Sequence, residues 1–122
     1  MKFYNPYWSD RLKISTLQRW ILVQSYLYYE LDCSFVSDKY YDSNAYQLVE
    51  MQKDNKEAAK ESQYWYVFND FDGTTGFDLY SRLTAKDKAR IKQVAWHCKT
   101  VMQDGVHVSN DGLMNYGVQG GK

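Results

Sequence analysis

Tyrosine and aspartate side chains gather on both sides of a short turn that follows a helical pattern of apolar residues. Past the turn, Ser37 and Asp38 have the pattern of a helix start, because a serine hydroxyl accepts a first-turn amide and an aspartate lies at the positive end of the helix dipole. The sequence therefore predicts a helical hairpin. Aromatic rings that stack and carboxylates that accept hydrogen bonds can together hold a flat polar ring. The candidate binding residues are Tyr28, Tyr29, Asp38, Tyr41 and Asp42.

This stretch resembles the hairpin in the N-terminal (Ia) domain of NAD-dependent DNA ligases. The family's hairpin typically has Tyr-Tyr, two residues and Asp, then Ile-Ser-Asp, two residues and Tyr-Asp, and the resemblance covers residues 17–52. The residues in register are Tyr28, Tyr29, Asp32, Val36, Ser37, Asp38, Tyr41 and Asp42. The resemblance implies that the tyrosine pair, the aspartate after the serine and the closing Tyr-Asp contact the nicotinamide mononucleotide (NMN) half of NAD.

The turn departs from the family pattern at two places. Cys33 and Ser34 follow the first aspartate where the family usually has proline, and Tyr40 stands where the family has glutamate. That glutamate would close a capping box on Ser37, so its absence weakens the cap. Downstream, nothing resembles the adenylation lysine motif, the nucleotidyltransferase sheet, the zinc finger or the helix-hairpin-helix repeats of a ligase. We therefore expect neither a complete ligase nor an enzyme, and no catalytic residue.

Length and charge limit the kind of partner. With 122 residues the chain has room for one small domain, and its 15 lysines and arginines balance its 15 aspartates and glutamates. This balance excludes both a strongly acidic DNA mimic and a strongly basic nucleic-acid binder, so a partner must be recognised locally. Aromatic residues make up 17% of the chain, and they favour contact surfaces as well as a core.

Cysteine usage and hydropathy indicate the compartment. Cys33 and Cys98 lack the spacing of metal ligands, so we interpret both as free thiols in a reducing compartment and expect no metal site. The longest apolar run of the first helix, residues 20–23, is far shorter than the roughly 18 residues of a membrane span. No signal-peptide pattern opens the chain. The sequence therefore predicts a soluble, cytoplasmic protein with no membrane contact.

The pattern of elements predicts an α+β fold, built as a single domain over residues 1–122. An aromatic arm over residues 1–14 is expected to pack on the domain. After the last predicted helix, a second small hairpin is expected over residues 106–116, and residues 117–122 are expected to form a flexible tail.

Two helices make up the predicted N-terminal hairpin. Ser15 and Gln18 have the spacing of a capping box, which predicts a first helix over residues 16–31. The second helix begins after Ser37 and runs into a charged stretch over residues 53–61. We expect that stretch to be a solvated face.

A small antiparallel β-hairpin is predicted over residues 63–83. Two stretches rich in aromatic and apolar residues, 63–68 and 77–83, flank a loop that contains glycines. We interpret Asp70 and Asp72 in this loop as turn residues, because the other ligand positions of a calcium loop are missing.

The last predicted helix, over residues 85–103, has one apolar and one basic side. Its apolar stripe is Ile91, Val94, Ala95, Cys98, Val101 and Met102. Four residues fall along one exposed line and form the candidate partner-binding surface: Lys88, Lys92, Trp96 and Lys99. Cations interleaved with an aromatic ring suit a phosphate backbone, unstacked bases or an acidic protein patch. The alternative is an ordinary solvated helix face.

These patterns support three hypotheses about function. We favour a non-catalytic, phage-type interaction protein that binds and inhibits or regulates a host nucleic-acid-processing enzyme by protein contact in the host cytoplasm, with anti-defence activity such as anti-CRISPR as one form. Direct nucleic-acid contact would be secondary. The chain resembles small ligase-like phage and prophage proteins that join such a hairpin to a similar aromatic segment. The alternative is an NMN- or NAD-binding accessory module, and the third hypothesis is a ligase-derived structural module without a ligand.

No obligatory cofactor is expected. In the ligase family the hairpin closes over a nucleotide that another domain holds, so a hairpin by itself contacts one face of the ligand. Few buried atoms then offset an association entropy of at least ~4 kcal/mol. NMN or NAD should therefore bind weakly or not at all.

Overall fold

The described part of the chain is helical. The computed structural model describes residues 7–74 and 78–103. The helices are α1 (Asp10–Glu30), α2 (Asp38–Asp54), α3 (Lys56–Lys60), α4 (Trp65–Phe68) and α5 (Ala85–Gln103), with a 3₁₀ turn, η1 (Tyr80–Arg82), before α5. No strand occurs among these residues, so the α+β prediction is wrong and the observed class is all-α. None of the described helices is long and apolar enough to cross a membrane.

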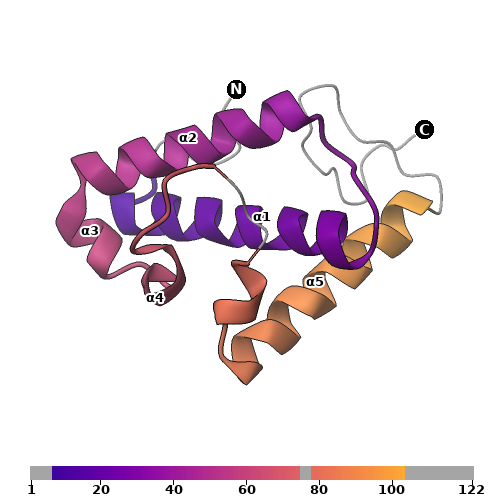
Figure 1. Ribbon diagram of the computed structural model, residues 1–122. Helices are drawn as coiled ribbons and strands as arrows, with labels where there is room; N and C mark the ends of the chain where they lie inside the picture. Colours follow the sequence, from indigo (N-terminus) through magenta and orange to yellow (C-terminus); the bar gives the residue numbers. More distant parts are fainter. Residues whose placement is uncertain (1–6, 75–77, 104–122) are drawn as a thin grey trace.

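Helix α1 lies at the centre of the fold, between α2 and α5 (Figure 1). α2 returns antiparallel along α1, and α5 crosses α1 on the other side. Every residue of α1 from position 20 to position 27 is buried, whereas a surface helix keeps one polar face in water. The other elements therefore enclose α1 along this part of its length.

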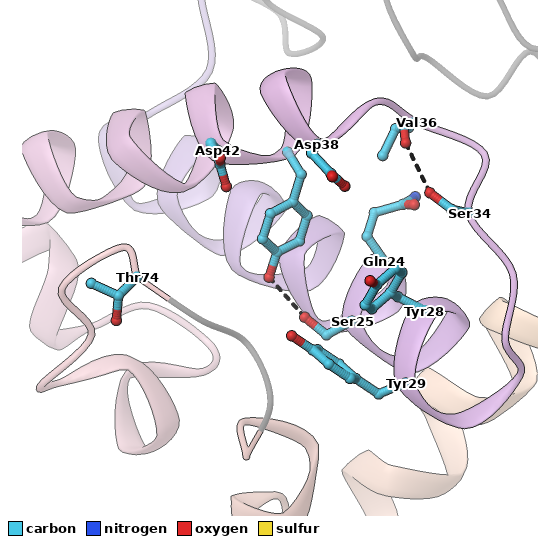
Figure 2. Close-up of a pocket in the computed structure, with 10 residues that line it drawn as sticks. Gln24, Ser25, Tyr28, Tyr29, Ser34, Val36, Asp38, Asp42 and Thr74 are labelled. Atoms are coloured by element: carbon cyan, nitrogen blue, oxygen red, sulfur yellow. Dashed lines mark hydrogen bonds between the residues drawn. The ribbon is translucent and has the colours of Figure 1, made fainter.

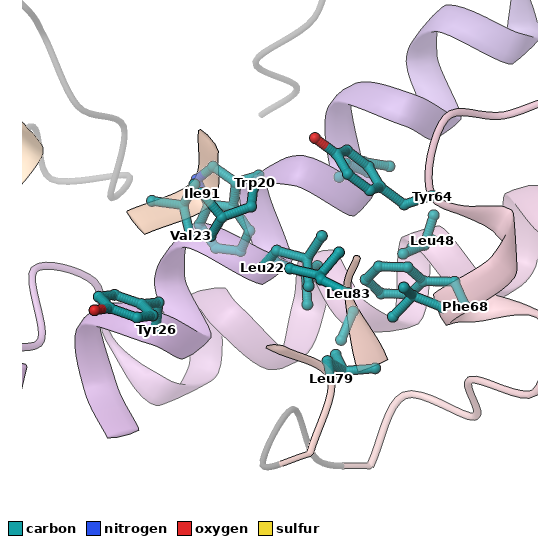
Figure 3. Packing of buried hydrophobic residues seen from close by; sticks show 14 of the residues in the cluster. Trp20, Leu22, Val23, Tyr26, Leu48, Tyr64, Phe68, Leu79, Leu83 and Ile91 are labelled. Atoms are coloured by element: carbon teal, nitrogen blue, oxygen red, sulfur yellow. The ribbon is translucent and has the colours of Figure 1, made fainter. Parts of the chain in front are cut away.

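One apolar cluster joins these elements (Figure 3). The ring of Tyr26 on α1 lies 4.7 Å from the ring of Tyr80 on η1. The buried members that come from elements around α1 include Leu48, Tyr64, Phe68, Leu79, Leu83 and Ile91. Burying one large apolar side chain contributes about 1.5–3 kcal/mol, so this cluster is the main source of stability.

A buried amide lies within this apolar cluster. Gln18 is 0% exposed, and its Nε2 donates to Oε1 of Gln52 (2.9 Å) and to Oγ of Ser62 (2.8 Å). Its Oε1 accepts the backbone amide of Tyr64 (3.1 Å). Gln52 in turn donates through Nε2 to the carbonyl of Phe68 (3.2 Å). These bonds tie α1 to α2 and to both ends of α4.

Helix α1 begins at Asp10 rather than at residue 16. Ser9 is its N-cap, and the serine Oγ accepts an amide of the first turn at 3.2 Å. The predicted capping box at Ser15 and Gln18 is wrong, because both side chains bond to distant segments of the chain. The Oγ of Ser15 accepts the amide of Gln63 (3.0 Å), and Gln18 takes part in the buried network.

The β-hairpin predicted over residues 63–83 is also wrong, since the described residues of this segment, 63–74 and 78–83, contain α4 and η1 and no strand. Tyr64, Val67 and Phe68 are all fully buried, and their i, i+3, i+4 spacing matches one helical turn rather than the alternation of a strand. Aromatic and β-branched residues suit half-buried surfaces in general. Their enrichment therefore did not specify a strand here.

The other predicted element boundaries either agree with the structure or fall outside the described residues. α2 begins directly after Ser37, and α5 spans residues 85–103 as predicted. Of the arm expected over residues 1–14, the end belongs to α1, and residues 1–6 lie outside the described residues. The second hairpin and the tail, both expected after residue 103, also lie outside the described residues.

Replacing Gln18 by leucine should lower the free energy of unfolding by about 2–4 kcal/mol, because the buried partners of its amide lose their hydrogen bonds at ~1–3 kcal/mol each. Urea denaturation followed by circular dichroism measures this loss. Arg19→Ala, at the exposed neighbouring position, should change stability by less than about 0.5 kcal/mol. Equal midpoints for the two variants would show that the network contributes nothing.

Candidate functional site

The turn between α1 and α2 brings the ends of the two helices together. Asp32 has a φ of 52°, a left-handed conformation that aspartate tolerates better than most residues. The amide of Cys33 donates to the carbonyl of Leu27 (2.8 Å), which ends α1. Ser37 is the N-cap of α2, as predicted, and its Oγ accepts the amide of Tyr40 (3.0 Å). Local hydrogen bonds therefore set both sides of the turn.

A pocket of about 280 Å³ lies between α1 and α2 beside this turn (Figure 2). Every residue predicted from the sequence to bind a ligand lines it. The described lining residues are Gln24, Ser25, Tyr28, Tyr29, Ser34, Val36, Asp38, Tyr41, Asp42 and Thr74. Asp38 and Asp42 project from α2, and Tyr28 and Tyr29 project from α1. The hairpin thus gathers the aromatic rings and carboxylates around one space.

Tyr41 joins the two helices inside the pocket. Its hydroxyl oxygen and the Oγ of Ser25 lie 2.9 Å apart, and either group can donate. The Tyr41 ring also packs against Trp20, with ring centroids 6.0 Å apart. Burial raises the pKa of the Tyr41 hydroxyl above its usual value, against a smaller opposing effect of the bond to Ser25. The hydroxyl therefore stays neutral at physiological pH and can donate a hydrogen bond.

Tyr28 and Tyr29 form an open aromatic corner of the pocket. Their ring centroids lie 4.9 Å apart with an interplanar angle of 88°, an edge-to-face arrangement. The residues are 54% and 43% exposed, so ring surface is open to a ligand. Asp38 and Asp42 lie one turn apart on the same side of α2, and none of the described lining residues is cationic. Rings beside two carboxylates favour a flat ligand that carries positive charge.

Thr74 reaches the pocket from the loop after α4. Gly73 has a φ of 86°, and a Cβ there would lie 3.3 Å from Cγ2 of Val49 on α2. Glycine thus permits both the backbone conformation and the close approach to α2. The Oδ1 of Asp72 accepts the amide of Thr74 (3.0 Å) and its hydroxyl (2.6 Å). The interpretation of Asp72 as a turn residue is therefore confirmed.

Some lining residues were not predicted from the sequence. They are Gln24, Ser25, Ser34, Val36 and Thr74. Gln24 and Ser25 lie four residues before the tyrosine pair, so the i, i+4 spacing of one helix face would have identified them. Thr74 carries no such local signal, because only the packing of its loop on α2 brings it to the pocket.

The predicted basic line on α5 is separate from this pocket, since no α5 residue belongs to the described lining. Lys92 and Trp96 are exposed, Trp96 to 43%. The ammonium group of Lys99 lies 5.1 Å from the centre of the Trp96 ring, and that of Lys88 lies 5.9 Å from the centre of the Tyr80 ring. Lys88 and Lys99 are half-buried rather than exposed as predicted, since each ammonium group lies beside an aromatic ring.

Arg82, which precedes α5, forms ion pairs with two aspartates at the surface. Its Nη1 donates to Oδ1 of Asp70 (2.7 Å), and its Nη2 donates to Oδ2 of Asp78 (3.1 Å). Arg82 therefore does not belong to the exposed basic face. Within residues 7–74 and 78–103, no group of side chains has the arrangement of a metal site, and neither Cys33 nor Cys98 is in a disulfide.

The fold and the pocket define a small helical domain with an aromatic, acidic pocket at a helical hairpin. No protein-family model matches the sequence, and neither a curated protein nor a solved structure is significantly similar to it. The likeness to the ligase Ia domain thus consists of the types and spacing of the hairpin residues.

Ser25→Ala and Tyr41→Phe should each lower the free energy of unfolding by about 1 kcal/mol, because each removes the hydrogen bond that joins α1 to α2. Since both break the same bond, the double variant should also lose about 1 kcal/mol rather than 2. Tyr46→Phe, at a tyrosine of α2 that is 66% exposed, serves as the control and should leave stability unchanged. Additive losses in urea denaturation would show that the two hydroxyls do not interact.

Proposed function

We propose that the protein is a non-catalytic binding protein whose pocket recognises the nicotinamide riboside part of NMN or NAD. One observation carries this proposal: the residues that correspond to the NMN-contacting positions of the ligase hairpin all line one pocket. The oxidised nicotinamide ring is flat and positively charged. Tyrosine faces attract such a ring through their quadrupoles, and the two carboxylates attract it through charge.

The charge of the lining determines which part of the nucleotide enters. Two aspartates, with no cation among the described lining residues, would repel a phosphate. The volume of about 280 Å³ lies near the lower end of small-molecule sites, which span roughly 300–1,000 Å³. The pocket therefore suits one ring with its ribose better than a whole dinucleotide. The phosphate would remain in solvent or contact a partner.

Polar groups of the lining can orient such a ligand. The carboxylates of Asp38 and Asp42 accept hydrogen bonds, which suits the hydroxyls of a ribose or the amide hydrogens of the carboxamide. A tyrosine hydroxyl is protonated at neutral pH, and burial raises the pKa of Tyr41 further, so this hydroxyl can donate to the carboxamide oxygen while it accepts from Ser25. Since Tyr28 and Tyr29 leave one side of the ligand open, we expect weak binding, with Kd on the order of 0.1–1 mM.

Nicotinamide riboside should bind at least as tightly as NMN, because it lacks the phosphate that the aspartates repel. The reduced riboside, whose ring is uncharged, should bind more weakly than the oxidised form by roughly threefold to tenfold. Ligand-observed NMR titration of the three compounds measures this order. A tighter complex with the reduced riboside would contradict the role of the carboxylates.

Asp38→Asn and Asp42→Asn should each weaken riboside binding by roughly threefold to tenfold, which corresponds to the loss of one solvent-exposed charge interaction. Glu50→Gln removes an exposed carboxylate of α2 outside the pocket lining and should leave binding unchanged. The proposal fails if no saturable binding is detected with the unmodified protein, or if all three variants bind alike.

Incubation of the protein with NAD and Mg²⁺ should leave its mass unchanged. The described pocket lining contains no lysine that could take up AMP as a covalent nucleophile. Intact-mass spectrometry checks this expectation. An added AMP group on the chain would overturn the non-catalytic part of the proposal.

The hypothesis of a phage-type inhibitor of a host nucleic-acid-processing enzyme stays as a second proposal. The observation that favours it is the exposed Trp96 on the basic face of α5, because exposed tryptophans often anchor macromolecular contacts. An inhibitor can use such a face either to touch the enzyme or to cover the enzyme's nucleic-acid substrate. This second proposal can be tested by adding the protein to host extract and measuring nuclease and ligase activity on an oligonucleotide. Trp96→Ala serves as the control.

A further inference from the structure

Charge is concentrated on helix α5. The helix has five cations (Lys86, Lys88, Arg90, Lys92 and Lys99) against one carboxylate, so it carries +4, and because the whole chain is neutral the remainder carries −4. That carboxylate, Asp87, is half-buried and accepts a hydrogen bond from the Tyr66 hydroxyl. The exposed side of α5 is therefore basic without an interspersed acid.

No ion pair within residues 7–74 and 78–103 neutralises a cation of α5. Among the described residues, the ion pairs join Lys60 to Glu57 and Arg82 to two aspartates, and none includes a cation of α5. The cations of α5 remain available for an anionic partner.

Trp96 lies within this row of charges. It is 43% exposed, although Ile91, Ala95 and Cys98 on the other side of α5 are fully buried in the core. The Lys99 ammonium group lies 5.1 Å from the centre of the indole ring. Lys92 is one helical turn before Trp96, on the same face. A flat aromatic surface and positive charges are therefore presented together.

We propose that the basic face of α5, formed by Lys88, Lys92, Trp96 and Lys99, binds single-stranded nucleic acid. The three lysines would contact phosphates, and Trp96 would stack on a base. At a rise of about 1.5 Å per residue, the row from Lys88 to Lys99 extends roughly 16 Å, enough for a short run of nucleotides. Stacking on an aromatic side chain beside cations is the usual way in which proteins bind unpaired strands without sequence preference.

The composition of the face favours nucleic acid over a protein partner. All three cations of this face are lysine, a residue that is depleted in protein interfaces, where arginine is enriched. A duplex offers no unstacked base to Trp96. A membrane-binding helix needs a free apolar face, whereas the apolar stripe of α5 is buried against the core. A single strand matches both the charge and the exposed ring.

This inference does not depend on the pocket, because the two sites share no described residue. The riboside titration of the pocket therefore reports separately on the proposed function. A variant altered on α5 should bind nicotinamide riboside as the unmodified protein does.

The proposal can be tested with the full chain by fluorescence anisotropy. The probe is a labelled oligothymidylate of about 20 nucleotides, in low salt near 50 mM. The unmodified protein should bind with Kd of roughly 1–100 µM, more tightly than it binds a duplex of the same length. The indole fluorescence should be quenched on binding. No binding of the single strand, or equal binding of the duplex, would overturn the proposal.

Charge-reversing and stacking variants locate the contact. Lys88→Glu with Lys92→Glu should weaken binding more than about tenfold and reduce the slope of log K against log salt by roughly 1.4, at about 0.7 per phosphate contact. Trp96→Ala should weaken binding by roughly fivefold to a hundredfold, and Trp96→Phe should retain most of the affinity because a ring remains to stack.

The matched control is Lys53→Glu with Lys56→Glu, which changes the net charge equally at exposed positions away from α5. This control should bind within about twofold of the unmodified protein. If it loses as much affinity as the α5 variant, binding depends on net charge and the proposed face is wrong. If polyglutamate or phosphatidylserine vesicles bind through Trp96 and the oligonucleotide does not, the partner is an acidic protein or a membrane, and the proposal fails.

Discussion

The side-chain amide of Gln18 joins the central helix α1 to the segments that enclose it. Because Gln18 is 0% exposed, water cannot solvate its amide, and the hydrogen bonds must come from within the fold. The amide finds its partners in Gln52, Ser62 and the backbone of Tyr64. Hydrogen bonds are directional, so the amide also selects one arrangement of α2 and α4 around α1. The loop that follows α4, and with it the position of Thr74 beside the pocket, depends on that arrangement.

The pocket forms where α1 leaves the core. Burial ends at Leu27, and the next residues, Tyr28 and Tyr29, are exposed. The turn then brings the first turn of α2 beside the last turns of α1, so the lining combines buried polar groups, Gln24 and Ser25, with exposed rings and carboxylates. A ligand bound there would contact side chains that the packing of the core holds in place. The same packing explains why a chain this small can form a pocket at its surface.

The two candidate sites differ in charge. The pocket is lined by carboxylates, whereas α5 carries a net charge of +4. A polyanion is therefore attracted to α5 and repelled from the pocket, and a cationic ring experiences the reverse. Screening over about 8 Å at physiological ionic strength keeps the two fields largely local. A chain that is neutral overall can thus carry two surfaces of opposite charge, which its net charge does not indicate.

The sequence by itself determined the features that depend on neighbouring residues. The hairpin of α1 and α2 was predictable because its cap at Ser37 and its turn are local hydrogen-bonded structures, and the pocket residues at the turn followed from that geometry. The limits of α5 and the exposure of Trp96 followed from a clear helical stripe. Only the tertiary structure decided that the segment from Tyr64 to Phe68 is helical, that Gln18 is a buried junction rather than a cap, and that Thr74 reaches the pocket. In each of these cases the deciding contact joins residues far apart in the chain, and burial against α1 outweighs weak local preference.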